Sequence, residues 1–388
     1  MILDRLTRRR LSKERATTTT RFISPTRVAR TTRNLAAKTW RRLNTLSHRA
    51  GKRIDLGTRV AAVKSFATVT LPGHTRVWLH RHRRRVVRIL CATLQRRLPT
   101  AMRYYAHEWL LTNRESRRLY QHAAPALDHT QETIVDALSR TGLAVVPFDQ
   151  LFRGRAQWQR LAEDAAAFRR EAETRLGGLA IPSASRKKRY LWRRYTRDVE
   201  LSLRDEWLQV AASCRILDVV NSYLALYAKL IYVDQWYTPP TGPVAERVAS
   251  QRWHRDFTDR HLVKVFIYLS DVDDGSGPFQ YVLESASGRY SRLWPWRPLG
   301  LMYPPLEQFV RKVPASAIAT VTGRAGTVIF CDTTGFHRGG FATERWRMMA
   351  VFNYASPACL HSLAARNFRI APSELRRDLP PAVRFTLG

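Results

Sequence analysis

The residues whose types and spacing could do chemistry together lie between positions 250 and 356. His254 and Asp256 are separated by one residue, His337 follows much later, and Arg347 comes shortly after it. Two imidazoles and one carboxylate can hold Fe(II) on one face and leave positions open for a co-substrate and oxygen. An arginine can clamp a carboxylate through two parallel hydrogen bonds. The set would suit an oxygenase that uses iron and 2-oxoglutarate.

The pair His254 and Asp256 is weak evidence for a metal site by itself, because a histidine that simply pairs with an aspartate is common in long chains. The surrounding pattern favours a site. Residues 261–271 alternate apolar and polar side chains, and residues 326–331 and 348–354 are two more β-rich runs. We therefore expect the candidate ligands at strand ends in a β-rich region, where a barrel can bring distant residues together.

Arg347 would begin the last of these strands and share a face with Met349 and Val351, so its side chain can point inward. Arg345, one strand repeat earlier, remains an alternative clamp. The letters His-Arg-Asp at 254–256 also begin a kinase catalytic loop, but no Asp-Phe-Gly follows and no glycine-rich loop precedes them. A kinase is excluded.

Residues 138–356 resemble the phytanoyl-CoA dioxygenase family of double-stranded β-helix oxygenases. The resemblance implies that His254, Asp256 and His337 bind Fe(II), and that Arg347 binds the distal carboxylate of 2-oxoglutarate. It implies O2-dependent hydroxylation, although desaturation or ring formation needs the same ligands. The matching motifs are Trp253-His254-x-Asp256, the strand end Tyr268-Leu269-Ser270-Asp271-Val272, the turn Gly277-Pro278-Phe279, Gly326-Thr-Val-Ile-Phe, His337-Arg-Gly-Gly340 and Arg347.

Two regions leave the substrate open. The family often places a Pro-Gly-Ser-His segment after the Gly-Pro turn, whereas this chain has Glu-Ser-Ala-Ser-Gly at 284–288. A Trp/Pro-rich insert at 290–312 follows, which would suit either a lid over the barrel mouth or a loop packed on its own domain. The first barrel strand, expected at 229–237, offers Tyr232 or Gln235 as a second 2-oxoglutarate contact, and plain core packing is an equal alternative for both.

Positive charge is concentrated at the amino-terminal end. The chain has a formal net charge of +35, and residues 1–100 hold 26 of its 66 lysines and arginines but only three acids. Such a stretch can attract a phosphate-bearing or acidic partner, and a solvated extension without a partner is the alternative. We expect residues 1–105 to form a basic extension that is partly helical or disordered.

Cysteine usage and hydropathy bear on location. The four cysteines are isolated, and no Cys-x-x-Cys pair or apolar signal segment is present. The most apolar stretch, residues 217–233, contains Asp218, Asn221 and Lys229, so it does not suit a membrane span. We expect a reduced, cytoplasmic protein without a transmembrane segment.

The predicted fold class is α+β: a double-stranded β-helix, that is, a jelly-roll or cupin-like barrel, flanked by helices. The oxygenase domain would cover residues 106–388, with the barrel core at about 228–356, and the tail at 358–388 would wrap the barrel exterior. Gly142 should end a helix in the left-handed conformation. Helices are expected at 106–123, 130–140, 156–175, 198–212 and 216–226, and a strand at 143–148.

The predicted function is therefore an Fe(II)- and 2-oxoglutarate-dependent dioxygenase that hydroxylates a small-molecule or carrier-bound substrate. Two alternatives stay open. One is a non-catalytic barrel that serves as a binding module, with the basic arm on nucleic acid or phosphate. The other is a cupin-like metalloenzyme that does not use 2-oxoglutarate. The intact set of His254, Asp256, His337 and Arg347 disfavours both.

Overall fold

The computed structural model describes residues 113–176, 191–195, 199–241, 247–256, 258–293, 303–359, 366–376 and 378–388. The predicted basic extension at 1–105, and its boundary with the following domain, lie outside these ranges and stay predictions. In the described ranges, no helix combines the length and the apolar character that a membrane crossing requires.

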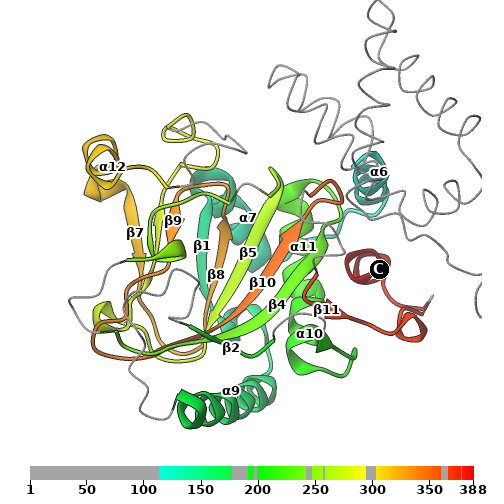
Figure 1. The fold of residues 1–388 in the computed structure, drawn as a ribbon. Helices are drawn as coiled ribbons and strands as arrows, with labels where there is room; N and C mark the ends of the chain where they lie inside the picture. Colours follow the sequence, from blue (N-terminus) through cyan, green and yellow to red (C-terminus); the bar gives the residue numbers. More distant parts are fainter. Residues whose placement is uncertain are drawn as a thin grey trace, which may run out of the picture. The chain divides into compact units, whose positions relative to one another are not determined.

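Two antiparallel sheets organise the described residues. The larger sheet has six described strands, which lie side by side in Figure 1. In pairing order they are β1 (Leu143–Pro147), β8 (Thr327–Asp332), β5 (Leu262–Tyr268), β10 (Arg347–Ala355), β4 (Lys229–Thr238) and β2 (Trp192–Arg193). The four strands expected at 143–148, 261–271, 326–331 and 348–354 are thus present, as is the expected first barrel strand.

The smaller sheet has three described strands, in the order β7 (Ile318–Val321), β6 (Phe279–Val282) and β9 (His337–Arg338). From β5 to β10 the chain passes to the smaller sheet for β6 and β7, returns for β8, crosses again for β9 and returns for β10. This alternation is that of a jelly roll. The predicted double-stranded β-helix flanked by helices is confirmed.

The two sheets pack face to face through an apolar core. Alternate residues of each strand point into it, because successive side chains of a strand lie on opposite faces. This inner cluster comprises Leu143, Phe266, Tyr268, Val272, Phe279, Tyr281, Val321, Ile329, Cys331, Met349 and Val351. The inner face of β10 is therefore the one that also bears Arg347.

Helices cover the outer face of the larger sheet. One buried cluster joins Leu138, Leu161, Leu208 and Leu217 from these helices to Val265, Phe330 and Phe352 from the strands. The helices that contribute are α7 (His129–Thr141), α8 (Phe148–Leu151), α9 (Arg155–Leu176), α10 (Glu206–Ala211) and α11 (Cys214–Leu224). The other described α-helices are α6 (Arg114–His122), α12 (Leu306–Lys312) and α13 (Pro381–Leu387), and the short 3-10 turns are Ala249–Gln251, Asp274–Ser276, Ala315–Ala317 and Pro372–Glu374.

Helix α7 illustrates how local sequence sets the element bounds. The side chain of Asp128 accepts a hydrogen bond from the backbone N of Gln131 at 3.0 Å, and Gln131 Oε1 accepts one from the Asp128 backbone N at 3.1 Å. This capping box fixes the first turn. Gly142 ends the helix with φ of 82°, the left-handed conformation predicted from the sequence.

The helix predicted at 198–212 is wrong in its first half. Residues Val199–Glu200 form β3, which pairs in parallel with β11 (Phe368–Arg369), and Asp205 then caps the shorter α10. Pairing with a distant segment overrides the local helical pattern. The tail also does more than wrap the exterior, because Thr386 and Leu387 are fully buried.

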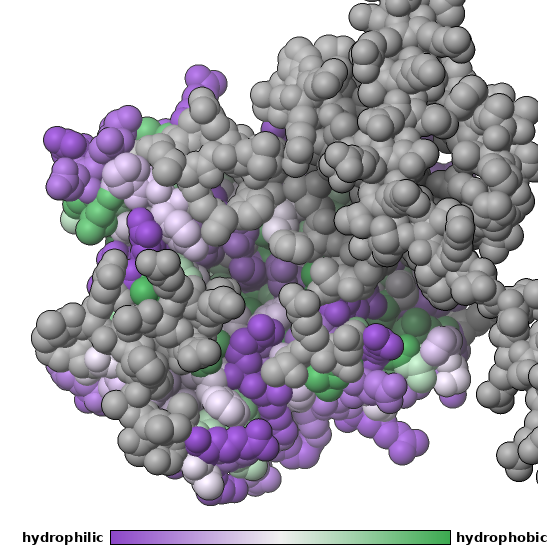
Figure 2. All heavy atoms as spheres, viewed as in Figure 1, coloured by the Kyte–Doolittle hydropathy of each residue, from purple (hydrophilic) through white to green (hydrophobic). Residues whose placement is uncertain are grey.

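The insert at 290–312 contains α12, which the sequence analysis did not anticipate. Its Phe309 is buried against Trp253, while Leu306 and Val310 are more than half exposed. Figure 2 shows a green patch among hydrophilic atoms where Figure 1 places α12. Within the described part of the insert, α12 thus packs against the barrel through Phe309.

Candidate metal centre

His254 and His337 are joined by their backbones before their side chains meet. The His254 amide donates to the His337 carbonyl at 3.1 Å, and the His337 amide donates to the His254 carbonyl at 3.0 Å. This bridge adds His254 to the edge of the smaller sheet beside β9. The two ring centroids lie 4.3 Å apart. The fold therefore brings together two histidines that are remote in sequence.

Each imidazole is oriented by a backbone carbonyl. His254 Nδ1 lies 2.8 Å from the Arg252 oxygen, and His337 Nδ1 lies 3.0 Å from the Gly335 oxygen. A carbonyl can only accept, so each Nδ1 must donate its proton. Each Nε2 then carries the lone pair, which is the form in which a neutral histidine binds a metal.

Asp256 completes a three-residue group. Its amide donates to the Thr333 carbonyl at 2.8 Å, and its Oδ2 accepts a hydrogen bond from Lys264 Nζ at 2.5 Å. His337 Nε2 lies 3.8 Å from the same oxygen. The ligand atoms of His254, Asp256 and His337 all lie within 4.8 Å of one another.

The local electrostatics favour the protonation states that bind a metal. Burial, together with the nearby His254, lowers the pKa of His337 to about 3, so this imidazole is neutral at neutral pH. Burial opposes ionisation of Asp256, but the positive charge of Lys264 outweighs it and holds the pKa of Asp256 well below its usual range. A neutral His337 and an ionised Asp256, together with the second imidazole of His254, match the donor set of an Fe(II) facial triad.

Arg347 lies on the inner face of the barrel at the start of β10. Its side chain is buried, with an exposed fraction of 5%, and it donates to the Gly277 carbonyl. Beside it, Tyr268 Oη donates to the Val321 carbonyl at 2.7 Å and accepts from the Phe279 amide at 3.0 Å. Arg347, Tyr268 and Phe279 are all buried, so this end of the barrel is closed to bulk water.

Arg345, the alternative clamp, points elsewhere. It lies before the first residue of β10, is 62% exposed, and forms an ion pair with Asp273. Gly339 lies near Arg347: a β-carbon at position 339 would sit 3.8 Å from Arg347 Nη2. Of the two arginines, only Arg347 reaches the chain segment that follows His337.

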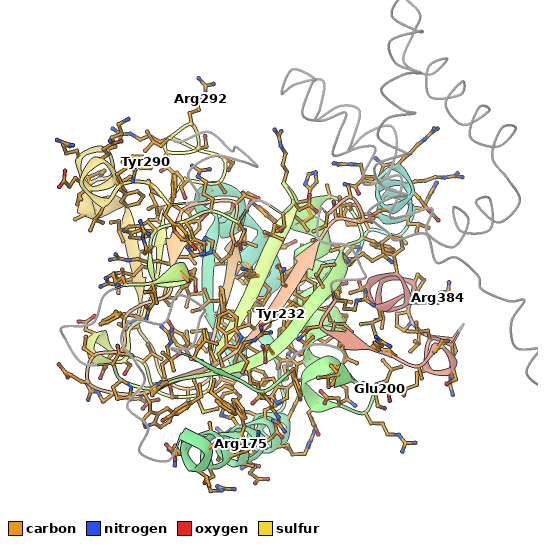
Figure 3. The ribbon with its side chains drawn as sticks, in the orientation of Figure 1. Arg175, Glu200, Tyr232, Tyr290, Arg292 and Arg384 are labelled. Atoms are coloured by element: carbon orange, nitrogen blue, oxygen red, sulfur yellow. The ribbon has the colours of Figure 1, made fainter. Side chains whose placement is uncertain are left out.

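The two residues proposed for a second co-substrate contact lie on opposite faces of β4. Tyr232 packs with the inner cluster and donates from its hydroxyl to Asp234 Oδ2 at 2.6 Å; Figure 3 labels it among the barrel strands. Gln235 lies on the outer face, where its side-chain amide donates to Asp164 of α9 at 3.1 Å. Gln235 therefore does not face the candidate centre.

Lys264 was not among the site residues predicted from the sequence. The alternation of β5 would have placed it inside, because it shares a face with Phe266 and Tyr268. The insert does approach the centre, as the ring of Tyr303 lies 6.0 Å from that of His254 and beneath the guanidinium of Arg252.

Neither a family model nor a curated protein sequence matches this chain. Several solved structures are similar. The epimerase SnoN, in complex with Fe3+, alpha-ketoglutarate and nogalamycin RO, has 18% identity and a TM-score of 0.41, and the match covers 58% of this chain and 84% of that one.

Two more structures have similar scores. HygX from Streptomyces hygroscopicus, with nickel and 2-oxoglutarate bound, has 18% identity and a TM-score of 0.39 over 60% of this chain and 88% of that one. EctD from S. alaskensis, with 2-oxoglutarate and 5-hydroxyectoine, has 17% identity and a TM-score of 0.42, and the match covers 66% of this chain and 86% of that one. Similarity at this level assigns no activity or substrate to this chain.

Proposed function

We propose that this protein is an Fe(II)- and 2-oxoglutarate-dependent oxygenase that hydroxylates a small-molecule or carrier-bound substrate, in the manner of the phytanoyl-CoA dioxygenase family. The observation that supports it most is the convergence of His254, Asp256 and His337 inside a jelly roll that also buries Arg347 on its inner face. Iron and 2-oxoglutarate would supply the oxidation of a substrate C–H bond by O2, with release of succinate and carbon dioxide.

The chain's own residues would hold the ion in a fixed orientation. His254 and His337 would offer Nε2, because each Nδ1 is used on a backbone carbonyl. Asp256 would offer a carboxylate oxygen, and its Oδ2 lies 3.8 Å from His337 Nε2 while it also accepts from Lys264. Three ligands from one face leave the opposite face open for co-substrate and oxygen.

Arg347 would bind the distal carboxylate of 2-oxoglutarate. Its guanidinium is rigid and planar, so it can form two parallel hydrogen bonds to one carboxylate. Its burial, with an exposed fraction of 5%, would keep water from competing for those bonds. The Gly277 carbonyl would be its partner only until the carboxylate arrives.

Anaerobic titration of the Fe(II)-loaded protein tests this proposal. Adding 2-oxoglutarate should produce a visible charge-transfer band, and admitting oxygen should release succinate. If iron binds but 2-oxoglutarate has no effect, a cupin-like metalloenzyme of another kind is the better description. If no metal binds at all, the non-catalytic binding module remains.

The same preparation can search for the substrate. Succinate release should rise above the uncoupled rate when a pool contains the true substrate, and mass spectrometry of that pool should show a gain of one oxygen atom. A loss of two hydrogens instead would indicate desaturation or ring formation by the same ligands.

A further inference from the structure

One arginine stands between two of the candidate metal ligands in the sequence. Arg255 follows His254 and precedes Asp256, and His254 pairs with His337 as a β-bridge. Successive side chains of such an extended segment lie on opposite sides. The guanidinium carbon of Arg255 lies 4.0 Å from the centre of the Phe336 ring, one residue before His337. The side chain of Arg255 therefore extends behind the ligands, against the segment that carries the third one.

Arg255 reaches its hydrogen-bond acceptors on two further segments. Its Nη1 donates to the Thr334 carbonyl at 3.1 Å. Its Nη2 lies 3.0 Å from the carbonyl oxygen of Tyr290, 3.1 Å from that of Ser291 and 3.2 Å from that of Leu293. Three carbonyls of one loop thus turn toward the same nitrogen. A single side chain therefore links both metal-ligand segments to the loop that begins the insert.

A cation is a costly way to make these contacts. Within the described ranges the hydrogen-bond acceptors of Arg255 are backbone carbonyls, and its Nε is buried without a partner. Taking a charge out of water costs free energy that neutral dipoles repay only in part. An uncharged amide side chain could hold one or two carbonyls at lower cost. What a guanidinium adds is a rigid plane whose donors reach two segments at once.

The other described end of the insert contacts the same ligand segment. The Phe309 ring of α12 stacks on that of Trp253 at 4.8 Å. The Tyr303 ring lies 6.0 Å from the ring of His254 and 4.8 Å from the guanidinium of Arg252. Each of the four consecutive residues 252–255 thus contacts the insert. The segment that carries His254 is held between the edge of the smaller sheet and the insert.

We propose that Arg255 is a positioning residue that couples the loop at 290–293 to the metal ligands. When this loop moves away, Arg255 loses three of its acceptors, and His254 and Asp256 lose part of the support that fixes them relative to His337. Such coupling is reciprocal, so a metal ion that binds the three ligands should also hold the loop in place. The inference rests on the metal-binding part of the proposed function and does not depend on 2-oxoglutarate.

Trypsin cleavage after Arg292 reports opening of this loop in the full-length protein. Arg292 is exposed, and Figure 3 shows its side chain extending outward. Cleavage of a locally opened form follows the population of that form when closing is fast. Co(II) at 100 times its Kd should slow this cut by at least about tenfold, and complete coupling gives about 100-fold. Cleavage after Arg324, which is exposed in the turn before β8, is the internal control and should not change.

Arg255→Met keeps the length of the side chain and removes its donors. It should weaken Co(II) binding roughly 10- to 100-fold, the range for groups that orient metal ligands. It should also change the visible absorption spectrum of bound Co(II) and abolish the protection of the cut after Arg292. Arg289→Met is the matched control, because Arg289 is exposed in the same region of the chain. This control should resemble the wild type in all three measurements.

Two results would overturn the inference. One is an Arg255→Met variant with lower stability but unchanged Co(II) affinity and spectrum, because Arg255 would then only hold the loop. The other is wild-type protein that binds Co(II) without any change in the cut after Arg292, a result that needs no variant to fold.

The same experiment separates this inference from the proposed function. Wild-type protein that binds no Co(II) would remove the metal centre, and the proposed function would fail together with the coupling. Protection of the cut after Arg292 by Co(II), in a protein that does not respond to 2-oxoglutarate, would support the coupling while the proposed function fails.

Discussion

Arg347 and Lys264, two cations on the inner face of the larger sheet, have different hydrogen-bond acceptors. Arg347 is buried, and it donates a hydrogen bond to the carbonyl of Gly277. Lys264 is more exposed, and its acceptor is the carboxylate of Asp256. The proposed function assigns the carboxylate of the co-substrate to Arg347, whereas Lys264 already holds a carboxylate of the protein itself.

The largest effect should come from the ligands between the two ends. His254→Ala or Asp256→Ala should weaken metal binding by at least about 1,000-fold, because a binding free energy of order 10 kcal/mol is divided among very few ligands. Metal titration followed by calorimetry measures it, with His129→Ala on α7 as the control. Tight metal binding in both variants would remove this site from consideration.

At the Arg347 end, Arg347→Gln should leave the co-substrate carboxylate without its charged partner in a buried position. A loss of about 2–5 kcal/mol corresponds to a fall in 2-oxoglutarate affinity of roughly 30-fold to several thousand-fold. Metal affinity should not change.

Arg345→Gln is the matched control for that experiment, because Arg345 is exposed and paired with Asp273. If Arg347→Gln responds to 2-oxoglutarate as the wild type does and Arg345→Gln has a lower affinity for it, then Arg345 is the residue that clamps the co-substrate. No effect of either would mean that 2-oxoglutarate is not the co-substrate.

At the Lys264 end, the carboxyl of Asp259 connects the loop before β5 to the end of β10 by hydrogen bonds. It accepts from Ser356 Oγ at 2.6 Å, and burial raises its pKa to about 6. Between about pH 4 and pH 6 the folded state then binds more protons than the unfolded chain, so the free energy of unfolding should fall as pH rises, by up to about 3 kcal/mol.

Asp259→Asn cannot ionise and should lose that slope in denaturant unfolding measured across the pH range. Asp136→Asn, on the exposed surface of α7, is the control and should keep it. Identical profiles for wild type and Asp259→Asn would show that this carboxyl does not titrate in the window.

The smallest effect should come from Tyr268→Phe at the closed end. Its hydroxyl joins the Val321 carbonyl to the Phe279 amide, and both groups would lose a buried partner. We expect unfolding to become easier by about 1–2 kcal/mol, while Tyr290→Phe in the insert changes it by less than about 0.5 kcal/mol. Equal stabilities would show that water enters this end and replaces the hydroxyl.

The strands of the barrel could be predicted because their alternation is local and strong, as in residues 261–271. The three metal-ligand candidates could be named because few residue types bind metals. The same alternation could have placed Lys264 on the inner face, but its role could not be predicted, because that role depends on Asp256, which only the fold brings beside it. The helix predicted at 198–212 failed for the same reason, since β3 depends on β11, which lies far along the chain.

The hydrogen bonds between His254 and His337 link metal release to local opening. Because each residue donates its amide to the other, separating the short β9 from residue 254 moves both imidazoles at once. An ion bound between them has to leave before that opening or during it. Bound metal should therefore slow solvent exchange of these two amide protons by a factor that grows with metal concentration. Their exchange rates thus report how long an ion stays in the site, even when no reaction takes place.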